Sequence, residues 1–261
     1  MPGRQPVGDM EPGMSHSKAP DFAGYLSVVV PVRDEADNVL PLLDEIDAAL
    51  KGLAGYEVIF ADDGSRDETA ARLAAAGPAH PGLRVLRLRQ SCGQSTALHM
   101  GVRAARHPWI ATLDGDGQND PADLPRLLEA VSAGQRPPRL DLVIGWRTGR
   151  HDSALRKLSS RVANAVRGGL LRDRTPDTGC GLKVFARDTY LRLPFFDHQH
   201  RFLPALFIRE GREVRSIPVH HRPRVRGTSK YGLHNRLWVG ITDLVGMMWL
   251  MRRMKHPVIE S

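Results

Sequence analysis

Cysteines and aromatic residues are scarce in this sequence of 261 residues. The two cysteines, Cys92 and Cys180, are far apart and belong to no Cys-x-x-Cys pair, which excludes a disulfide framework or a zinc knuckle and indicates a reducing, cytoplasmic environment. Aromatic residues form 6% of the chain, too few to supply the stacking platforms of a protein that binds single-stranded nucleic acid. We therefore expect no nucleic-acid partner.

The sequence also has no apolar segment long enough to cross a bilayer. Residues 1–22 are rich in Pro, Gly and Ser and contain no signal-peptide core, so they are expected to form a disordered arm. Residues 237–251 are mostly apolar, but a membrane-spanning helix needs about 20 such residues. We expect 236–261 to form an amphipathic helix and tail that lie at a membrane interface, or that pack against a membrane protein or a second copy of the chain.

Charge is distributed unevenly along the chain. Residues 1–141 carry 14 Lys and Arg against 20 Asp and Glu, and residues 142–261 carry 23 against 9, so the two parts have net charges of −6 and +14. A basic segment of this size favours an anionic partner such as nucleic acid, lipid head groups or a phosphorylated ligand, and composition alone does not distinguish them.

Strand and helix patterns alternate regularly along the acidic part. Such alternation predicts an α/β fold with a mostly parallel sheet covered by helices on both faces, here as one domain over 23–235. Ligands bind such sheets beyond the carboxyl ends of the strands, so the residues after each strand are the candidate site. The expected strands are 26–32, 56–61, 83–88, 109–113, 140–145, 182–186 and 214–220, and the expected helices are 36–53, one opening at Ser65, 95–105, 121–131, a basic helix at 153–171, and two short ones near Asp188 and Arg201.

The second predicted strand ends in Asp62-Asp-Gly-Ser65. Ser65 and Glu68 have capping-box spacing, which predicts that their side chains bind backbone N–H groups at the start of the next helix. Asp62 and Asp63 either belong to that capping loop or accept hydrogen bonds from a nucleoside base or ribose.

The fourth predicted strand ends in Asp114-Gly-Asp-Gly-Gln118. Asp and Gly are common in surface turns, but the position after a buried strand favours a ligand site. Asp114 and Asp116 suit Mg²⁺ or Mn²⁺, which bind through few carboxylates, and Gln118 can add a neutral oxygen. Because clustered carboxylates repel one another, a cation or a donor-rich ligand is expected to compensate them.

These segments and several later ones give the chain a family resemblance over about residues 25–235. The sequence resembles the family-2 glycosyltransferases of the GT-A (Rossmann-like) fold, and more closely the polyprenyl-phosphate branch that includes dolichol-phosphate mannosyltransferases. The resemblance is carried by Val-Pro-Val-Arg-Asp-Glu35, Ala-Asp-Asp-Gly-Ser-Arg-Asp67, Leu-Asp-Gly-Asp-Gly-Gln-Asn-Asp-Pro121, Asp-Leu-Val-Ile-Gly-Trp-Arg147, Asp-Thr-Gly-Cys-Gly-Leu-Lys183 and Arg-Val-Arg-Gly-Thr-Ser-Lys230.

The resemblance implies three groups of site residues. The nucleotide would be held by Pro31, Arg33, Glu35, Asp62, Asp63 and Asp114. The metal would be bound by Asp114, Asp116 and Gln118. The acceptor phosphate would lie among Arg147, Arg161, Arg224, Ser229 and Lys230, and the residues closest to the chemistry would be Asp116, Arg147, Arg224 and Lys230. The chain departs from the branch at Trp146, where a small residue is common, and at Cys180 and Lys183, where the branch usually reads Ser-Gly-Phe-Arg.

The basic segment 220–231 suits a phosphate acceptor, although solvated surface charge is the simpler alternative for a basic loop. A phosphate monoester has a second pKa of about 6 and is already an anion at neutral pH, so it needs orientation by arginine rather than a base. A sugar hydroxyl would need a carboxylate base, and no Glu-Asp pair occurs in the later half to supply one. Asp177 stays open as a base.

The sequence therefore predicts an inverting glycosyltransferase that moves a sugar from a UDP- or GDP-linked donor to a polyprenyl phosphate. It would act peripherally at the inner face of the cell membrane and supply lipid-linked sugar for cell-envelope glycan or lipid modification. Two alternatives stay open: a transferase of the same fold that acts on a soluble sugar or a protein, and a non-catalytic subunit that binds membrane or nucleic acid.

Overall fold

The computed structural model describes residues 20–132, 134, 136–148, 167–171, 173, 175–223 and 233–253, with the backbone alone at 233–239. Its strands are β1 (Tyr25–Val32), β2 (Gly55–Asp62), β3 (Leu83–Arg87), β4 (Trp109–Thr112), β5 (Leu140–Arg147), β6 (Lys183–Ala186) and β7 (Glu213–Val219). Its helices are α1 (Val39–Leu50), α2 (Thr69–Ala76), α3 (Gln94–Ala104), α4 (Leu124–Glu129), α6 (Arg187–Arg192), α7 (Leu203–Arg209) and α8 (Leu233–Arg252), with 3-10 helices at Pro121–Asp123 and Gln199–Arg201.

The strands form one sheet in the order β3-β2-β1-β4-β6-β5-β7. Only β6 runs antiparallel to its neighbours β4 and β5, and the other pairs are parallel. Each predicted strand is present with ends within two residues of the expected ones. The predicted α/β class with a mostly parallel sheet is thereby confirmed.

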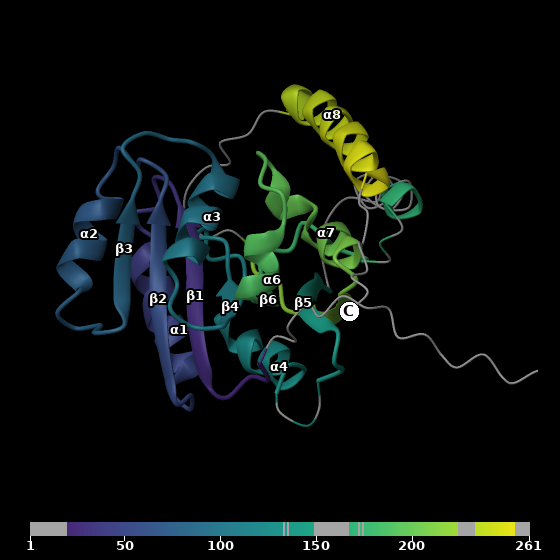
Figure 1. Ribbon diagram of the computed structural model, residues 1–261. Coiled ribbons are helices and arrows are strands. Elements are labelled where there is room, and N and C mark those ends of the chain that lie inside the picture. The colour runs from purple at the N-terminus through teal and green to yellow at the C-terminus, as the bar shows by residue number, and fades with distance from the viewer. Residues whose placement is uncertain are drawn as a thin grey trace, which may run out of the picture.

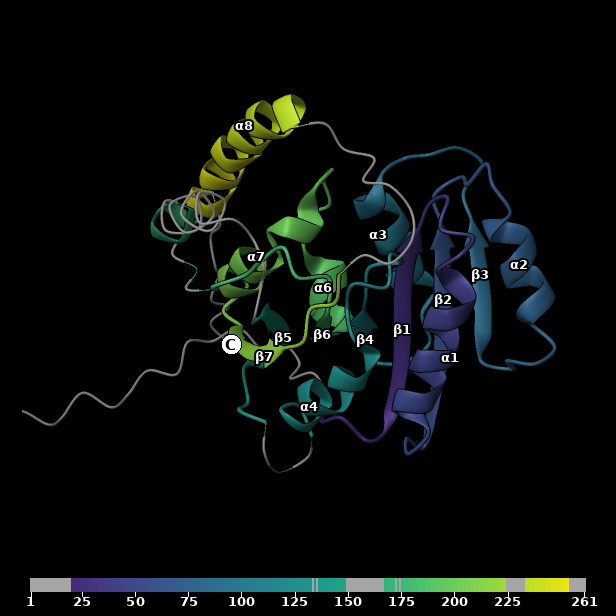
Figure 2. The ribbon, with the colours of Figure 1, turned by 180° about the vertical axis from the view of Figure 1, so that it is seen from behind.

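Helices cover both faces of the sheet, which explains why the central strands are apolar along their whole length. One core cluster joins the sheet to α1, α2 and α4, and the other joins it to α3, α6, α7 and α8. The helices α3 and α6 lie in front of the strands in Figure 1, whereas α1 lies in front in the reverse view of Figure 2. Strand β1 is apolar on both sides, with Val29 in one cluster and Val28 and Val30 in the other.

The N-terminal arm was predicted to reach residue 22, but Pro20–Phe22 contact the domain. Phe22 is buried, its backbone N–H donates to Val131 O over 3.1 Å, and it forms a β-bridge with Ser132. Pro20 O accepts a hydrogen bond from Trp109 Nε1 at 2.8 Å. The predicted end of the arm was therefore too late, because a single buried aromatic residue fixes this short stretch. Residues 1–19 lie outside the described chain.

The predicted capping box at Ser65 and Glu68 is wrong. Helix α2 begins at Thr69, and its first turn is bound by Asp67, whose Oδ1 accepts the backbone N–H of Thr69 at 2.9 Å. The Ser65 hydroxyl instead accepts the N–H of Asp34 at 2.9 Å. Ser65 therefore binds the loop after β1 and not the start of α2. The two bonded residues are 31 positions apart, so local spacing does not reveal this contact.

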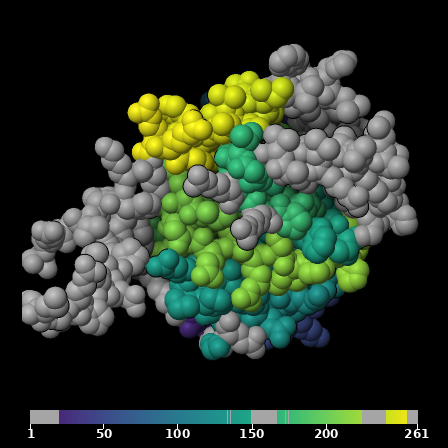
Figure 3. Space-filling view, turned by 90° about the vertical axis from the view of Figure 1, so that its right-hand side faces the viewer, coloured from purple at the N-terminus to yellow at the C-terminus, as the bar shows by residue number. Residues whose placement is uncertain are grey.

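Helix α8 lies at the end of the molecule toward which the carboxyl ends of the parallel strands point (Figure 1). Its inner face packs on the second core cluster through Met247, which is buried, and through Leu244 and Met251. Its outer face exposes Ile241, Val245 and Trp249, one helical turn apart, and α8 forms a surface ridge in the space-filling view of Figure 3. None of the helices in the described parts of the chain is long and apolar enough to span a membrane.

A buried carboxylate gives the fold a specific pH dependence. Glu57 accepts hydrogen bonds from Ser27 Oγ, Arg84 Nη1 and the backbone N–H of Arg106. Burial raises the pKa of Glu57, but these donors outweigh it and hold that pKa below its usual value. Because the folded pKa is depressed, the ionised form stabilises the fold above the unfolded pKa, and this contribution is lost as the pH falls through the folded pKa.

We expect Glu57→Gln to lower the free energy of unfolding by about 2 kcal/mol at pH 7, since charged hydrogen bonds are lost. The difference from wild type should shrink below about pH 4.5, where the unfolded carboxyl protonates. Urea unfolding of wild type and Glu57→Gln between pH 3 and 8 measures this difference in the free energy of unfolding. A difference that stays constant over this range would contradict the assignment.

Candidate active site

Residues from four strands meet at the carboxyl edge of the parallel strands. The segments after β1, β2 and β4 arrive there because these strands are parallel neighbours. Strand β6 is antiparallel, so its first residue lies at the same edge: Lys183 pairs with Thr112, the last residue of β4. The motif 177–183 therefore joins the site through the one reversed strand.

The Asp62 and Asp63 carboxylates are both buried at the end of β2. Asp62 Oδ1 accepts the backbone N–H of Ser65 at 2.8 Å and also its hydroxyl, while Oδ2 lies 3.5 Å from Arg87 Nε. Asp63 accepts the N–H groups of Cys92 at 2.6 Å and Gly93 at 3.1 Å. These carboxylates thus hold the loops that follow β2 and β3.

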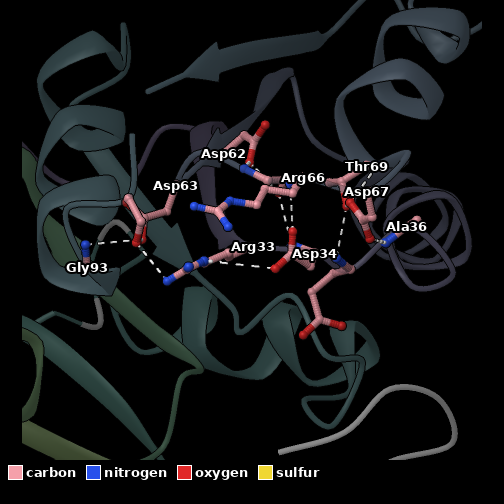
Figure 4. Close-up of polar contacts among 12 residues, drawn as sticks. Arg33, Asp34, Ala36, Asp62, Asp63, Arg66, Asp67, Thr69 and Gly93 are labelled. Atoms are coloured by element: carbon pink, nitrogen blue, oxygen red, sulfur yellow. Dashed lines mark hydrogen bonds and ion pairs between the residues drawn. The ribbon is translucent and has the colours of Figure 1, made fainter. Parts of the chain in front are cut away.

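Strand β1 contributes the neighbouring groups. Pro31 lies opposite Ala61 of β2, and two residues further the half-exposed Arg33 side chain points toward Asp63 in Figure 4. Arg33 Nη1 donates to Ser91 Oγ at 2.8 Å, and this hydroxyl donates to Asp63 Oδ2 at 2.7 Å. Glu35 accepts from Asn38 Nδ2 at 2.6 Å. Pro31, Arg33, Asp62 and Asp63 therefore lie at neighbouring strand ends, and Glu35 follows two residues after Arg33.

Asp34, between these residues, has a left-handed backbone conformation with φ of 50°. Its Oδ1 accepts the N–H of Arg66 at 2.7 Å, and its own N–H is bound by Ser65. This conformation is uncommon for a residue other than glycine, and the contacts on both sides maintain it. They link the loops that follow β1 and β2 (Figure 4).

The acidic turn after β4 is partly buried and internally bonded. Asp114 N–H donates to Asn119 Oδ1 at 2.9 Å, and Asp114 Oδ1 accepts from Gln94 Nε2 at 2.9 Å. Asp116 Oδ1 accepts the N–H of Gln118 at 3.1 Å across Gly117, whose φ of 72° suits glycine. Burial, followed by the nearby Asp116 carboxylate, raises the pKa of Asp114 above its usual value.

This donor set fits a hard divalent cation. Two carboxylates two residues apart share a partly dehydrated turn. Burial and then the Asp116 charge raise the pKa of Asp114, and a bound cation would offset both effects by stabilising the ionised form. Among the described residues, no three His, Cys, Asp or Glu side chains are grouped as a complete metal cage. A cation bound through Asp114 and Asp116 would then retain waters or take ligand phosphates, as Mg²⁺ usually does.

Basic groups lie close to the acidic turn, and the charges of Lys183 and Arg147 both act on Asp114. The Lys183 ammonium is buried and donates to Cys180 O, and its burial lowers its pKa. Arg147, at the end of β5, forms a two-bond pair with Asp177, with Nε–Oδ2 at 2.7 Å and Nη2–Oδ1 at 2.8 Å. Both oxygens of Asp177 thus hold Arg147, a geometry that favours a positioning role for this carboxylate over that of a base.

Gly181 is required by the packing of the acidic turn. A Cβ built at this position would lie 2.2 Å from Asp114 Oδ2 and 2.6 Å from Asn119 Oδ1. The backbone at Gly181 therefore packs directly against the Asp114 carboxyl group. Sequence reasoning used the 177–183 motif only for its resemblance and did not identify the contact.

The predicted acceptor residues Arg161, Arg224, Ser229 and Lys230 lie outside the described residues. The chain that precedes 224 runs beside the acidic turn. His221 forms a β-bridge with Asn119, and Arg222 N–H donates to Gln118 O at 3.0 Å. The Arg222 guanidinium also pairs with Asp120, at 2.6 Å. The last described residues before 224 therefore lie next to the acidic turn.

Sequence reasoning missed three residues that contact the acidic turn or its neighbours: Gln94, Asn119 and Ser95. Ser95 Oγ lies 2.7 Å from His200 Nδ1, and burial lowers the pKa of His200 well below its usual value. Asn119 was visible within the quoted motif, whereas Gln94 comes from α3 and carries no local signal. Its contact with Asp114 spans 20 residues.

The fold is shared with solved structures of other proteins. Mannosyl-3-phosphoglycerate synthase from Rubrobacter xylanophilus superposes with a TM-score of 0.69 at 16% identity, over 89% of this chain and 76% of that one. Glucosyl-3-phosphoglycerate synthase from Mycobacterium tuberculosis, solved with Mn²⁺, UDP-glucose and glycerol 3-phosphate, gives 0.64 at 19% identity, over 88% and 81%. These similarities show that the chain has the GT-A fold.

The family "Glycosyl transferase family 2" matches residues 27–192, and the chain belongs to this family. It is 35% identical to dodecaprenyl-phosphate galacturonate synthase of Rhizobium johnstonii, over 89% of this chain and 69% of that protein. It is 34% identical to undecaprenyl-phosphate 4-deoxy-4-formamido-L-arabinose transferase of Edwardsiella ictaluri, over 80% of this chain and 63% of the relative's length. The predicted family, its polyprenyl-phosphate branch and the enzyme class are confirmed.

Proposed function

We propose that this enzyme transfers a sugar from a nucleoside-diphosphate sugar, UDP- or GDP-linked, to a polyprenyl phosphate, with inversion at the anomeric carbon. The observation that carries the proposal is the opposition of charge at one sheet edge. The Asp114 and Asp116 carboxylates share this edge with the buried Lys183 and the Asp177-bound Arg147, whose positive charges act on Asp114. The names of the two relatives, both polyprenyl-phosphate sugar transferases, agree with it.

The proposed donor site comprises Pro31, Arg33, Glu35, Asp62, Asp63 and Asp114. A hydrogen-bonding surface at the ends of β1 and β2 suits a nucleoside, because carboxylates and loop N–H groups match its ribose and base. Asp62 and Asp63 act partly by fixing the loops around the ligand, since both accept bonds from those loops. We assign the half-exposed Arg33 side chain to direct contact with the nucleotide.

Asp114, Asp116 and Gln118 would hold Mg²⁺ or Mn²⁺. Support comes from the donor chemistry of the turn and from the Mn²⁺ in the M. tuberculosis structure. A bound cation would neutralise charge on the departing diphosphate. Gln118 Oε1 is the expected third protein oxygen.

The proposed acceptor side comprises Arg147, Arg161, Arg224, Ser229 and Lys230. An oxygen of the acceptor phosphate attacks the anomeric carbon, and the bond from that carbon to the diphosphate breaks, so that the nucleoside diphosphate leaves with the bonding electrons. The nucleophile is already anionic, so no side chain removes a proton. Arg147 remains charged and has three N–H groups beyond the two bound by Asp177, which suits it to orient the phosphate.

The lipid acceptor implies attachment to a membrane surface, and we assign this contact to the outer face of α8. Ile241, Val245 and Trp249 line that face, with Trp249 60% exposed, and Arg253 lies over the Trp249 ring at 5.6 Å. Apolar residues beside arginines suit the head-group region of an anionic bilayer. The enzyme would then act peripherally at the inner face of the membrane, with residues 23–235 as the catalytic domain and 236–261 as its membrane-facing extension.

Trp249→Ser should weaken binding to vesicles that contain anionic phospholipid by about 10-fold or more, since a buried aromatic side chain contributes about 1.5–3 kcal/mol. Co-sedimentation of the full chain measures it. Tyr25→Ser is the matched control, because Tyr25 is 48% exposed and lies at the start of β1, away from α8. If Trp249→Ser binds vesicles as wild type does but changes the oligomeric state, α8 contacts a second copy and not lipid.

The test of the proposed function is a screen of labelled sugar nucleotides with polyprenyl phosphate in vesicles, with and without a chelator. A lipid-extractable, acid-labile label that depends on the metal is the expected product. Parallel reactions contain a soluble sugar or glycerol phosphate in place of the lipid. Transfer to the soluble acceptor alone, with none to lipid, would overturn the assignment of a polyprenyl phosphate.

A further inference from the structure

We propose that Gln94 is a positioning residue for the carboxylate of Asp114. Gln94 would fix the orientation in which that carboxylate meets the cation, and Asp63 would hold Gln94 in place through the loop between β3 and α3, residues 88–93. This inference rests on the proposed function, because it assigns a role at the proposed cation site.

The contact itself is direct. Gln94 Nε2 donates to Asp114 Oδ1 at 2.9 Å, and this is an amide from α3 reaching a carboxylate after β4. The other oxygen, Oδ2, lies against the backbone at Gly181, where a Cβ would come within 2.2 Å of it. The Asp114 carboxylate is therefore confined by two contacts: Gln94 donates to Oδ1, and the backbone at Gly181 packs against Oδ2. A carboxylate so confined presents one defined orientation to a cation.

The position of Gln94 is fixed by the loop that precedes it. Gly93 has a φ of 92°, and its N–H donates to Asp63 Oδ2 at 3.1 Å. Asp63 also binds Ser91 Oγ and the N–H of Cys92, so one buried carboxylate holds three consecutive residues before α3. Both oxygens of Asp63 thus accept hydrogen bonds from this loop, and the carboxylate fixes the loop's conformation.

The first turn of α3 is also fixed from the opposite side. Ser95, the residue after Gln94, is buried and lies 2.7 Å from His200 Nδ1, and the backbone N–H of His200 donates to Ser95 Oγ at 3.3 Å. The backbone around Gln94 is therefore fixed by Asp63, which follows β2, and by His200 of the 199–201 turn. The N-cap residue of α3 is Gly93, so the Gln94 side chain does not stand in the capping position.

The amide is chemically suited to this role. It is a neutral donor, so it orients the carboxylate without adding a positive charge that would compete with the cation. Lys or Arg at this position would form an ion pair with Asp114 and oppose metal binding. A donor of this type next to a metal ligand typically contributes 10- to 100-fold to metal affinity or activity.

The test measures Mn²⁺ binding to the full chain, with no nucleotide and no turnover, from the electron paramagnetic resonance signal of free Mn²⁺. Gln94→Met keeps the length of the side chain but removes the donor, and we expect it to bind Mn²⁺ about 10- to 100-fold more weakly than wild type. Gln90→Met is the matched control in the same loop, since residue 90 is exposed, and it should bind as wild type does. Gln94→Ala serves as the second variant if Gln94→Met does not fold, and thermal unfolding checks each protein.

Unchanged Mn²⁺ affinity in a folded Gln94 variant would overturn the proposal, whatever happens to its turnover. An equal loss in the Gln90 control would overturn it as well, because the effect would then belong to the loop. Failure of the proposed function has a different signature: wild type would bind Mn²⁺ but transfer no sugar to polyprenyl phosphate.

Discussion

Asp116→Asn is expected to lower turnover by about 10³-fold or more at saturating Mg²⁺ or Mn²⁺, which corresponds to about 4 kcal/mol of lost transition-state stabilisation. The reason is electrostatic. The amide keeps the shape of the side chain but removes one of the two charges proposed to hold the cation at the departing diphosphate. The Asp116 carboxylate also raises the pKa of Asp114, so its neutralisation should make Asp114 easier to ionise without restoring the lost charge.

The measurement is the rate of label transfer into lipid, as a function of metal concentration, for Asp116→Asn and wild type. Asp188→Asn is the control, because it removes one carboxylate from α6, and Asp188 has a side chain that is 67% exposed. The control should retain wild-type turnover. Near-wild-type turnover of Asp116→Asn with saturating metal would remove the central element of the mechanism.

Gly181→Ala is expected to lower turnover by about 100-fold while leaving most of the stability intact. The new methyl group would meet Asp114 Oδ2 at 2.2 Å and Asn119 Oδ1 at 2.6 Å, so the Asp114 side chain must move away from its present position. Misplacement of a catalytic group by about 1 Å can cost about 10²-fold in rate. The displaced atoms belong to side chains, which can rotate, and the fold should therefore survive.

Steady-state kinetics and thermal unfolding of Gly181→Ala together check this expectation. Gly169→Ala is the control, since a Cβ there meets no atom of the described residues within 4 Å. It should match wild type in both measurements. If Gly181→Ala were unfolded at 25 °C, the glycine would serve the fold and not the orientation of Asp114; if it were fully active, the turn would tolerate the displacement.

The fold could be predicted from the sequence because strand and helix patterns alternate regularly in its first half. Strands buried on both faces are nearly continuous apolar runs, and the helix between β1 and β2 places apolar residues at positions 39, 42, 43, 46 and 50. These signals are local, so the element types could be assigned before the structure. The errors fell where a distant partner decided the outcome, as at Ser65, which binds the loop after β1, and at Phe22, which packs against the residues after α4.

For the candidate site, the sequence alone determined the chemistry: carboxylates after β2 and β4, an arginine after β5, and the motifs that identify the family. Their convergence could be expected because parallel strands end at a common edge. Only the tertiary structure decided which groups touch. The reversal of β6 brings Lys183 and Gly181 to that edge, and the packing of α3 brings Gln94 to Asp114. Contacts between residues far apart in the chain depend on strand direction and helix packing, and the local patterns revealed neither the reversal of β6 nor the contact of α3 with the acidic turn.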